Sequence, residues 1–284
     1  MTKNKLVKNE ITLENKGKKS ITLDLTYLEN STNQPLVIFC HGFKGFKDWG
    51  AFNLMAEKFA LNHFVFAKFN FSHNGTTPNN FADIHDIEAF GQNNYEIELD
   101  DLDRVIAWFE LDDNKFKNLY SIHEIYAIGH SRGGGIVLLK ASEDSRIKKI
   151  VTWATVNNFE KYMQLSDVVK WKETGVSFVD NVRTGIKLPL YYQFYENYYE
   201  NKNRLDLKEN VLKLDKPLLL LHGTADETVA VDDSQWIYEQ LDHSILVKLD
   251  GGNHTFGATH PWQKQSLPEI LNIAIEESIE FFTF

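Results

Sequence analysis

Hydrophobic and polar positions along this chain follow two different periods, and each period predicts one kind of element. Residues 5–14 and 20–29 alternate apolar and polar side chains, which is typical of strands with one buried face. The segment Asn15-Lys16-Gly17-Lys18 between them has the composition of a turn. These features predict an antiparallel hairpin at the start of the chain.

Beyond the hairpin, short apolar runs alternate with stretches whose apolar residues recur at helical spacing. The apolar runs predict strands at residues 36–40, 64–69, 124–128, 147–153, 217–221 and 245–249. The helical spacing predicts helices at residues 52–61, 97–109, 134–141, 234–241 and 268–281. Apolar strands separated by helices are typical of a mostly parallel central sheet with helices on both faces. We therefore expect an α/β fold.

This alternation breaks down between residues 154 and 214, where strand and helix signals are mixed. Aromatic side chains are concentrated in this segment, among them Phe159, Trp171, Phe178, Tyr191, Tyr192, Phe194, Tyr195, Tyr198 and Tyr199. The sheet pattern resumes at Pro217. We predict an α/β core built from residues 1–153 and 215–284, with residues 154–214 inserted as an aromatic-rich cap.

The composition excludes several classes of protein. With 284 residues, 43% of them hydrophobic and 25% charged, the chain can bury a large core. A net charge of -10 without a basic stripe disfavours nucleic acid as a partner. No run is long enough to span a membrane, and residues 1–10 lack the apolar core of a secretory signal. Cys40 is the single cysteine, so no internal disulfide can form. We expect a cytoplasmic protein with no membrane partner.

The strongest sign of chemistry is the pentapeptide Gly129-His130-Ser131-Arg132-Gly133, which lies between a predicted strand and a predicted helix. A serine at such a sharp turn has a strained backbone and an exposed hydroxyl. Glycines two residues away on each side let the flanking backbones approach each other. Ser131 is therefore a candidate nucleophile. Alternatively, Ser131 caps the helix, but a cap does not account for the paired glycines.

A nucleophilic serine needs a base, and the base needs an acid that orients it. Asp226 follows the strand predicted at 217–221, and His254 follows the next predicted strand in a glycine-rich loop. Both loops would lie at the carboxyl edge of the sheet, where ligands bind in such folds. We predict that Asp226 orients His254 and that His254 takes the proton of Ser131.

Nearby residues offer alternatives for both roles. His260 is the second candidate for the base, and Asp232 and Asp233 are alternative acids. Asp233 followed by Ser234 is also typical of a helix cap.

With these residues in this order, the chain resembles the α/β-hydrolases over essentially its whole length. Within that superfamily it is most similar to small bacterial carboxylesterases of the cinnamoyl or feruloyl esterase type, which are relatives of the prolyl oligopeptidase-like hydrolases. The similarity rests on the cap insertion, on the loop His41-Gly42-Phe43-Lys44-Gly45-Phe46-Lys47, and on His254-Thr255-Phe256 followed by His260-Pro261. The segment Asn70-Phe71-Ser72-His73-Asn74-Gly75 departs from it, because relatives usually carry an Asp-x-Arg-Gly-His-Gly-like loop there.

The resemblance implies an oxyanion hole made by two backbone N–H groups. One belongs to Arg132, which directly follows the nucleophile at a helix N-terminus, where the helix dipole favours an anion. The other belongs to Phe43, in the loop after the first parallel strand. The pair His41-Gly42 would let this loop approach the nucleophile, and its alternative role is an ordinary tight turn.

Substrate contacts are expected near the nucleophile and from the cap. Tyrosine and tryptophan present flat apolar faces with a polar tip, which suits an aromatic or acyl group. The alternative is that these aromatics simply form the core of a packed cap. The candidate substrate-binding residues are His41, Gly42, His130, Tyr191 and Tyr195. For His130, support of the turn at Ser131 is the alternative role.

We predict a serine hydrolase that cleaves a small or aromatic carboxylic ester through an acyl-enzyme. Its partner is a small-molecule ester, and neither a cofactor nor a metal is expected, since His-x-x-x-His spacing is absent. A peptidase or a thioesterase with the same three residues is the alternative within this chemistry. A catalytically silent ligand-binding protein is the alternative from another class. The sequence neither indicates nor excludes an oligomer.

Overall fold

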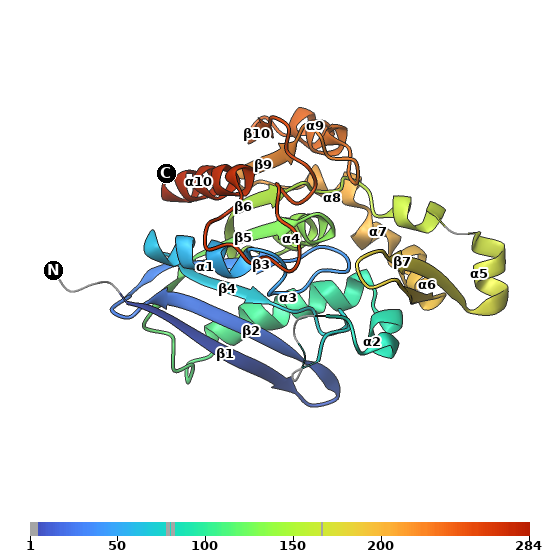
Figure 1. The fold of residues 1–284 in the computed structure, drawn as a ribbon, viewed down its shortest axis with the longest axis horizontal. Coiled ribbons are helices and arrows are strands. Elements are labelled where there is room, and N and C mark those ends of the chain that lie inside the picture. The colour runs from blue at the N-terminus through green and yellow to red at the C-terminus, as the bar shows by residue number, and fades with distance from the viewer. Residues whose placement is uncertain (1–4, 78–79, 81–82, 166) are drawn as a thin grey trace.

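An eight-stranded sheet forms the centre of the protein (Figure 1). The computed structural model describes residues 5–77, 80, 83–165 and 167–284. The strands lie in the order β1-β2-β4-β3-β5-β6-β9-β10. Their bounds are β1 (Leu6–Asn15), β2 (Lys18–Leu28), β3 (Gln34–Cys40), β4 (Val65–Phe69), β5 (Tyr120–His130), β6 (Ile147–Trp153), β9 (Leu218–Gly223) and β10 (Ser244–Leu249).

The first two strands form the antiparallel hairpin that the sequence predicts. Strand β1 pairs with β2, and Asn15 lies opposite Lys18 at the turn. Strand β2 is also antiparallel to β4, whereas the remaining strands of this sheet, in the order β4, β3, β5, β6, β9 and β10, are parallel to one another. This arrangement confirms the predicted fold class, because a mostly parallel sheet follows an antiparallel hairpin.

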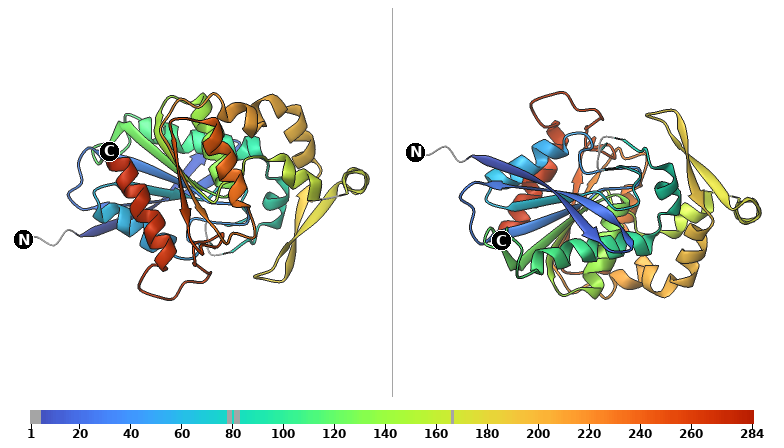
Figure 2. Two further views of the ribbon diagram at one scale, coloured as in Figure 1. Left: turned by 90° about the horizontal axis from the view of Figure 1, so that it is seen from above. Right: turned by 90° about the horizontal axis from the view of Figure 1, so that it is seen from below.

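Helices cover both faces of the sheet (Figure 2). Their bounds are α1 (Phe52–Leu61), α2 (Ile87–Gln92), α3 (Tyr95–Glu110), α4 (Arg132–Glu143), α9 (Val231–Gln240) and α10 (Glu269–Thr283). Helices α1 and α10 pack together over one face, and α3 and α4 pack together over the other. Strand β3 serves both cores, since Ile38 and Cys40 belong to one cluster and Val37 and Phe39 to the other. Both of its faces are therefore buried, as its unbroken apolar run predicts.

Between β6 and β9 the chain leaves the main sheet. This segment contains η1 (Glu160–Leu165), α5 (Val168–Thr174), β7 (Val176–Asn181), β8 (Ile186–Tyr191), α6 (Gln193–Glu200), α7 (Lys202–Leu205) and α8 (Leu207–Val211). Strands β7 and β8 form a separate antiparallel sheet, which stands out at one end of the molecule (Figure 2). Trp171 of α5 is buried and donates its indole N–H to the carbonyl of Leu190 at 2.7 Å, which anchors the hairpin.

The start of helix α9 differs from the sequence-based prediction. The helix begins at Val231 with Ala230 as its N-cap, so Asp233 lies inside the first turn and does not cap the helix. Asp233 accepts hydrogen bonds from the Asn157 N–H and from Lys161 Nζ instead. None of the helices in the described part of the chain is both long and apolar enough to cross a membrane.

A cluster of ion pairs is buried between the sheet and the loop that follows β3. Asp24 of β2 is fully buried and lies 2.5 Å from Lys68 Nζ of β4, 2.9 Å from Lys47 Nζ and 3.0 Å from Lys8 Nζ. Asp48 contacts Lys47 and Lys68 as well. Burial alone would raise the pKa of Asp48, but the charges of Lys68 and Lys47 hold it well below its usual range. Because Lys47 and Asp48 belong to the loop, the cluster fastens the loop to the sheet.

Replacing Asp24 with asparagine should destabilise the protein strongly. Asp24→Asn leaves buried lysine charges without their main partner, so the free energy of unfolding should fall by about 3–5 kcal/mol. Urea denaturation measures this loss. The control is Glu29→Gln, which breaks an exposed pair with Lys5 and should change stability little. Equal losses in the two variants would contradict the structural role of the cluster.

Candidate active site

Ser131 occupies the turn between β5 and α4. Its φ of 56° and ψ of -121° place a residue with a side chain in a region that glycine usually occupies. The turn is held by the Ser131 N–H, which donates to the Trp153 carbonyl at 2.8 Å, and by the Gly134 N–H, which donates to the Ser131 carbonyl. Within the described helix α4 the Ser131 side chain makes no capping hydrogen bond. The structure therefore favours the strained turn over the helix-cap alternative.

Close backbone contacts explain the glycines around Ser131. A Cβ atom on Gly129 would lie 2.6 Å from the carbonyl carbon of Gly133. A Cβ atom on Gly133 would lie 2.5 Å from the carbonyl oxygen of His41, in the loop after β3. A Cβ atom on Gly42 would lie 2.9 Å from the Cβ of Ser131. Side chains at these positions would push the nucleophile and the loop apart.

His254 and Asp226 are hydrogen-bonded to each other. His254 Nδ1 lies 2.8 Å from Asp226 Oδ2, and Asp226 Oδ1 accepts the N–H groups of Thr228 and Val229 at 2.8 and 2.9 Å. The Asp226 side chain is fully buried, and that of His254 is 17% exposed. Because the partner of Nδ1 is a carboxylate, Nδ1 carries the ring hydrogen and Nε2 is the basic nitrogen.

A second histidine supports Asp226 from the side of the core. His222 Nε2 lies 2.9 Å from the Val229 carbonyl and 3.3 Å from Asp226 Oδ2, and His222 Nδ1 lies 2.7 Å from Ser234 Oγ. Burial alone would raise the pKa of Asp226. The hydrogen bonds from His222, His254 and the Val229 N–H outweigh burial and hold that pKa well below its usual range. Asp226 is therefore ionised, as an orienting acid requires.

His41 cross-links two loops behind the site. Its Nδ1 lies 2.9 Å from the Gly42 carbonyl, and its Nε2 lies 3.3 Å from both the Phe71 N–H and Asn74 Nδ2. Nδ1 therefore donates and Nε2 accepts. Burial lowers the pKa of His41 to about 4, so the ring is neutral at physiological pH. His41 supports the loop, whereas the sequence-based prediction assigned it to substrate binding.

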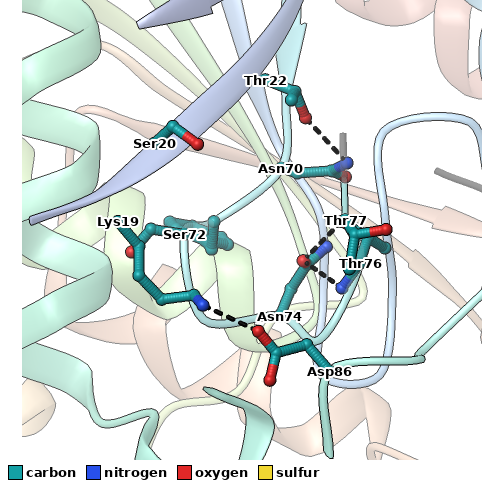
Figure 3. Close-up of a pocket in the computed structure, with 10 residues that line it drawn as sticks. Lys19, Ser20, Thr22, Asn70, Ser72, Asn74, Thr76, Thr77 and Asp86 are labelled. Carbon is teal, nitrogen blue, oxygen red and sulfur yellow. Dashed lines mark hydrogen bonds and ion pairs between the residues drawn. The ribbon is translucent and has the colours of Figure 1, made fainter. Parts of the chain in front are cut away.

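The segment Asn70–Gly75, which departs from the family pattern, buttresses the same loop. Asn70 Oδ1 accepts the Lys47 N–H at 2.6 Å, and Asn70 Nδ2 donates to Thr22 Oγ1 at 3.1 Å. Asn74 Nδ2 lies 3.3 Å from the Gly45 carbonyl. Asn70 and Asn74 line a cavity of 220 Å³. Figure 3 shows both side chains, together with the ion pair between Lys19 and Asp86, which line the same cavity. Ser131 is not among the described residues that line this cavity.

A larger cavity of 750 Å³ contains both Ser131 and His254 in its lining. The remaining lining residues are Phe43, Lys44, Arg132, Val156, Asn158, Lys161, Phe178, Val179, Asp180, Leu190, Phe194, Thr228, Val229, Ala230 and Asp233. These residues come from the carboxyl ends of β5, β6, β9 and β10, from the loop after β3, and from the cap. The structure thus brings Ser131, Arg132, Phe43 and His254 around one cavity.

Several predicted residues lie elsewhere. Among the described residues, neither Tyr191 nor Tyr195 lines the cavity. The Tyr191 hydroxyl donates to Glu88 Oε2, and Tyr195 stacks on Tyr192 with ring centroids 5.3 Å apart. These tyrosines face α2 and the interior of the cap, and their predicted contact with substrate stays a prediction.

Two further histidines have supporting contacts. His130 Nε2 donates to the His254 carbonyl at 2.8 Å. Burial and the neighbouring His254 lower the pKa of His130 to about 3. His260 accepts the Gly50 N–H and packs against Phe46. In the described part of the chain, no three histidine, cysteine or carboxylate side chains gather as metal ligands would.

The cavity wall includes residues that sequence reasoning missed. The hairpin β7–β8 contributes Phe178, Val179 and Leu190, and the polar pair Lys161–Asp233 lies at the same cavity, with Lys161 Nζ 2.6 Å from Asp233 Oδ1. Phe178 is exposed, in a strand without a clear buried face, so periodicity contains no signal for it. Phe178, Val179 and Leu190 all lie within the aromatic-rich segment 154–214.

The chain belongs to the α/β-hydrolase family: the sequence profile of the alpha/beta hydrolase fold matches residues 35–213. No protein of curated function matches the chain by sequence.

Solved structures share the fold at low sequence identity. Est1E from Butyrivibrio proteoclasticus with ferulic acid bound has a TM-score of 0.72 and 19% identity, covering 96% of this chain and 98% of its own. The esterase domain of a Rhodothermus marinus protein has a TM-score of 0.60 and 19% identity, covering 88% and 91%. A puromycin-hydrolysing peptidase from Mycobacterium tuberculosis has a TM-score of 0.65 and 15% identity, covering 97% of this chain and 38% of its own.

The close contact at Gly133 can be tested by substitution. Gly133→Ala should lower the free energy of unfolding by about 3 kcal/mol, because its new methyl group meets rigid backbone and overpacking of this kind is not relieved by rotamer changes. The control is Gly185→Ala in the β7–β8 turn, where nothing lies within 4 Å of the new atom and only the positive φ of 72° opposes it. Its cost should be about 1–2 kcal/mol. If urea denaturation ranked the two variants the other way, the contact would not be as tight as described.

Proposed function

We propose that this protein is a serine carboxylesterase. The observation that carries the proposal is the hydrogen bond between His254 Nδ1 and the buried carboxylate of Asp226, with His254 and Ser131 lining one cavity. An ionised carboxylate on Nδ1 leaves Nε2 basic, which is the state that a general base for a serine hydroxyl needs.

The proposed reaction uses Ser131, His254 and two backbone N–H groups. Ser131 Oγ attacks the ester carbonyl carbon, and its proton passes to His254 Nε2 as the C–O bond forms. The carbonyl electron pair moves to the oxygen, which accepts hydrogen bonds from the N–H groups of Phe43 and Arg132. The intermediate then collapses, and His254 returns the proton to the departing alcohol. Water attacks the acyl-enzyme by the same route and releases the acid.

The lining of the cavity supports a small or aromatic acyl group. Apolar side chains from the core and the cap form much of the wall, including Phe43, Val156, Phe178, Leu190 and Phe194. Such a surface suits an apolar acyl chain or a flat ring. The likeness to the Est1E structure that contains ferulic acid favours an aromatic acyl ester among these.

Peptide or thioester cleavage would use the same groups. The likeness to the puromycin-hydrolysing peptidase is the observation that favours a peptidase. This chain, however, corresponds to 38% of that protein, so the likeness concerns only a part of it. We therefore rank the ester first.

Ester hydrolysis should depend entirely on Ser131. The purified protein should hydrolyse p-nitrophenyl acetate, longer p-nitrophenyl esters or methyl ferulate, and Ser131→Ala should lose about 10⁴-fold or more in kcat. A matched amide series separates esterase from peptidase, and labelling by a fluorophosphonate separates both from a silent protein. Equal rates for wild type and Ser131→Ala would refute the proposal.

As the pH is lowered, the loss of kcat/KM should follow the binding of a single proton. His254 must be neutral to accept the proton of Ser131, so activity should fall as His254 becomes protonated. Asp226 adds no second proton, because its pKa is held well below the usual range. His41, with a pKa of about 4, stays neutral over the same range. The logarithm of kcat/KM should therefore fall with a slope of about one per pH unit over the range in which Glu98, whose pKa is raised by burial, is still ionised. A slope of two within that range would mean that a second group controls the site.

A further inference from the structure

A buried ion pair lies directly beside the nucleophile and takes no part in proton transfer. Arg132 is 2% exposed, and its Nη1 lies 3.3 Å from Oε1 of Glu98, in the first turn of α3. Glu98 is 4% exposed and also accepts Asn93 Nδ2 at 2.7 Å. Buried ion pairs are commonly no more stabilising than apolar side chains of similar volume. Stability alone is therefore a weak account of this pair.

The guanidinium of Arg132 is enclosed by aromatic rings. Its central carbon lies 4.1 Å from the centroid of the Phe43 ring, 5.2 Å from that of Tyr95 and 5.4 Å from that of Phe194. The Phe43 ring packs against Phe90 at 5.5 Å as well. A planar guanidinium stacks on an aromatic face in a defined orientation, which a lysine ammonium cannot reproduce.

Phe43 and Arg132 are also the two residues to which the proposed function assigns the oxyanion donors. Phe43 belongs to the loop after β3, and Arg132 begins helix α4, so their N–H groups come from separate segments. The start of α4 is fixed by the backbone contact of Gly133 with His41. Phe43 lies in the same loop, two residues beyond His41. Its ring contacts the Arg132 guanidinium and so links the Phe43 backbone directly to Arg132.

We propose that Glu98 and Arg132 are positioning residues for the oxyanion hole. Glu98 holds the guanidinium in place, the guanidinium holds the Phe43 ring, and the ring sets where the Phe43 N–H lies relative to the Arg132 N–H. This inference rests on the proposed esterase function. A displacement of about 1 Å in such a site can cost on the order of 10²-fold in rate.

A double variant separates positioning from stability. Glu98→Gln or Arg132→Met alone leaves one buried charge without its partner, so each should lower both Tm and kcat. The combination Glu98→Gln/Arg132→Met removes both charges and keeps similar volumes, so Tm should largely recover. Because the stack is still missing, kcat should remain about tenfold or more below wild type, with KM changed by less than about twofold.

Two further measurements address the donors themselves. An aryl trifluoromethyl ketone forms a Ser131 adduct that carries an oxyanion, so its inhibition constant should rise about tenfold in the double variant, in parallel with the loss of kcat. Arg132→Lys keeps a positive charge beside Glu98 but lacks the flat stacking surface. Its kcat should therefore stay below that of the wild type, as in the double variant.

The control is Asp103→Asn, because Asp103 of α3 pairs with Lys140 of α4 at 2.8 Å and joins the same two helices away from Phe43. This variant should leave kcat and the inhibition constant within about twofold of wild type. The inference fails if the double variant recovers kcat together with Tm, if Arg132→Lys restores kcat, or if Asp103→Asn loses as much kcat as the double variant. An inactive wild type would instead refute the esterase proposal, and this inference with it.

Discussion

The direct contact of backbone with backbone around Ser131 is the constraint on which the rest of the site depends. Strand β5, the start of α4 and the loop after β3 meet where Gly129 and Gly133 lack side chains. Any side chain there would separate the segments, because peptide groups in a packed core cannot move aside as a flexible side chain can. The strained conformation of Ser131 persists because the surrounding elements determine it.

Each remaining part of the site is held by a different kind of interaction. The buried ion pairs around Asp24 hold the loop after β3 against the sheet. Hydrogen bonding fixes the acid, since His222 and two backbone N–H groups converge on Asp226. These interactions hold the groups in place in the folded protein, so in the proposed reaction little reorganisation would accompany the development of charge.

From the sequence alone we could place the residues that come directly after the parallel strands. Ser131, Asp226 and His254 each follow a strand with an unmistakable apolar run, and parallel strands bring their carboxyl ends to one edge. Two parts could not be predicted. The wall formed by Phe178 comes from a small sheet with no buried face to impose a period. The roles of His41 and Tyr191 depend on tertiary contacts with Asn74 and Glu88, which sequence spacing does not encode.

The separation of the β7–β8 hairpin from the main sheet has an evolutionary consequence. The hairpin has its own strand pairing and forms part of the cavity wall, while the residues that would do the chemistry stand on the central sheet. Substitutions in the hairpin can therefore change the shape of the cavity without disturbing the strained turn at Ser131. Selection can act on ligand preference and on foldability almost independently.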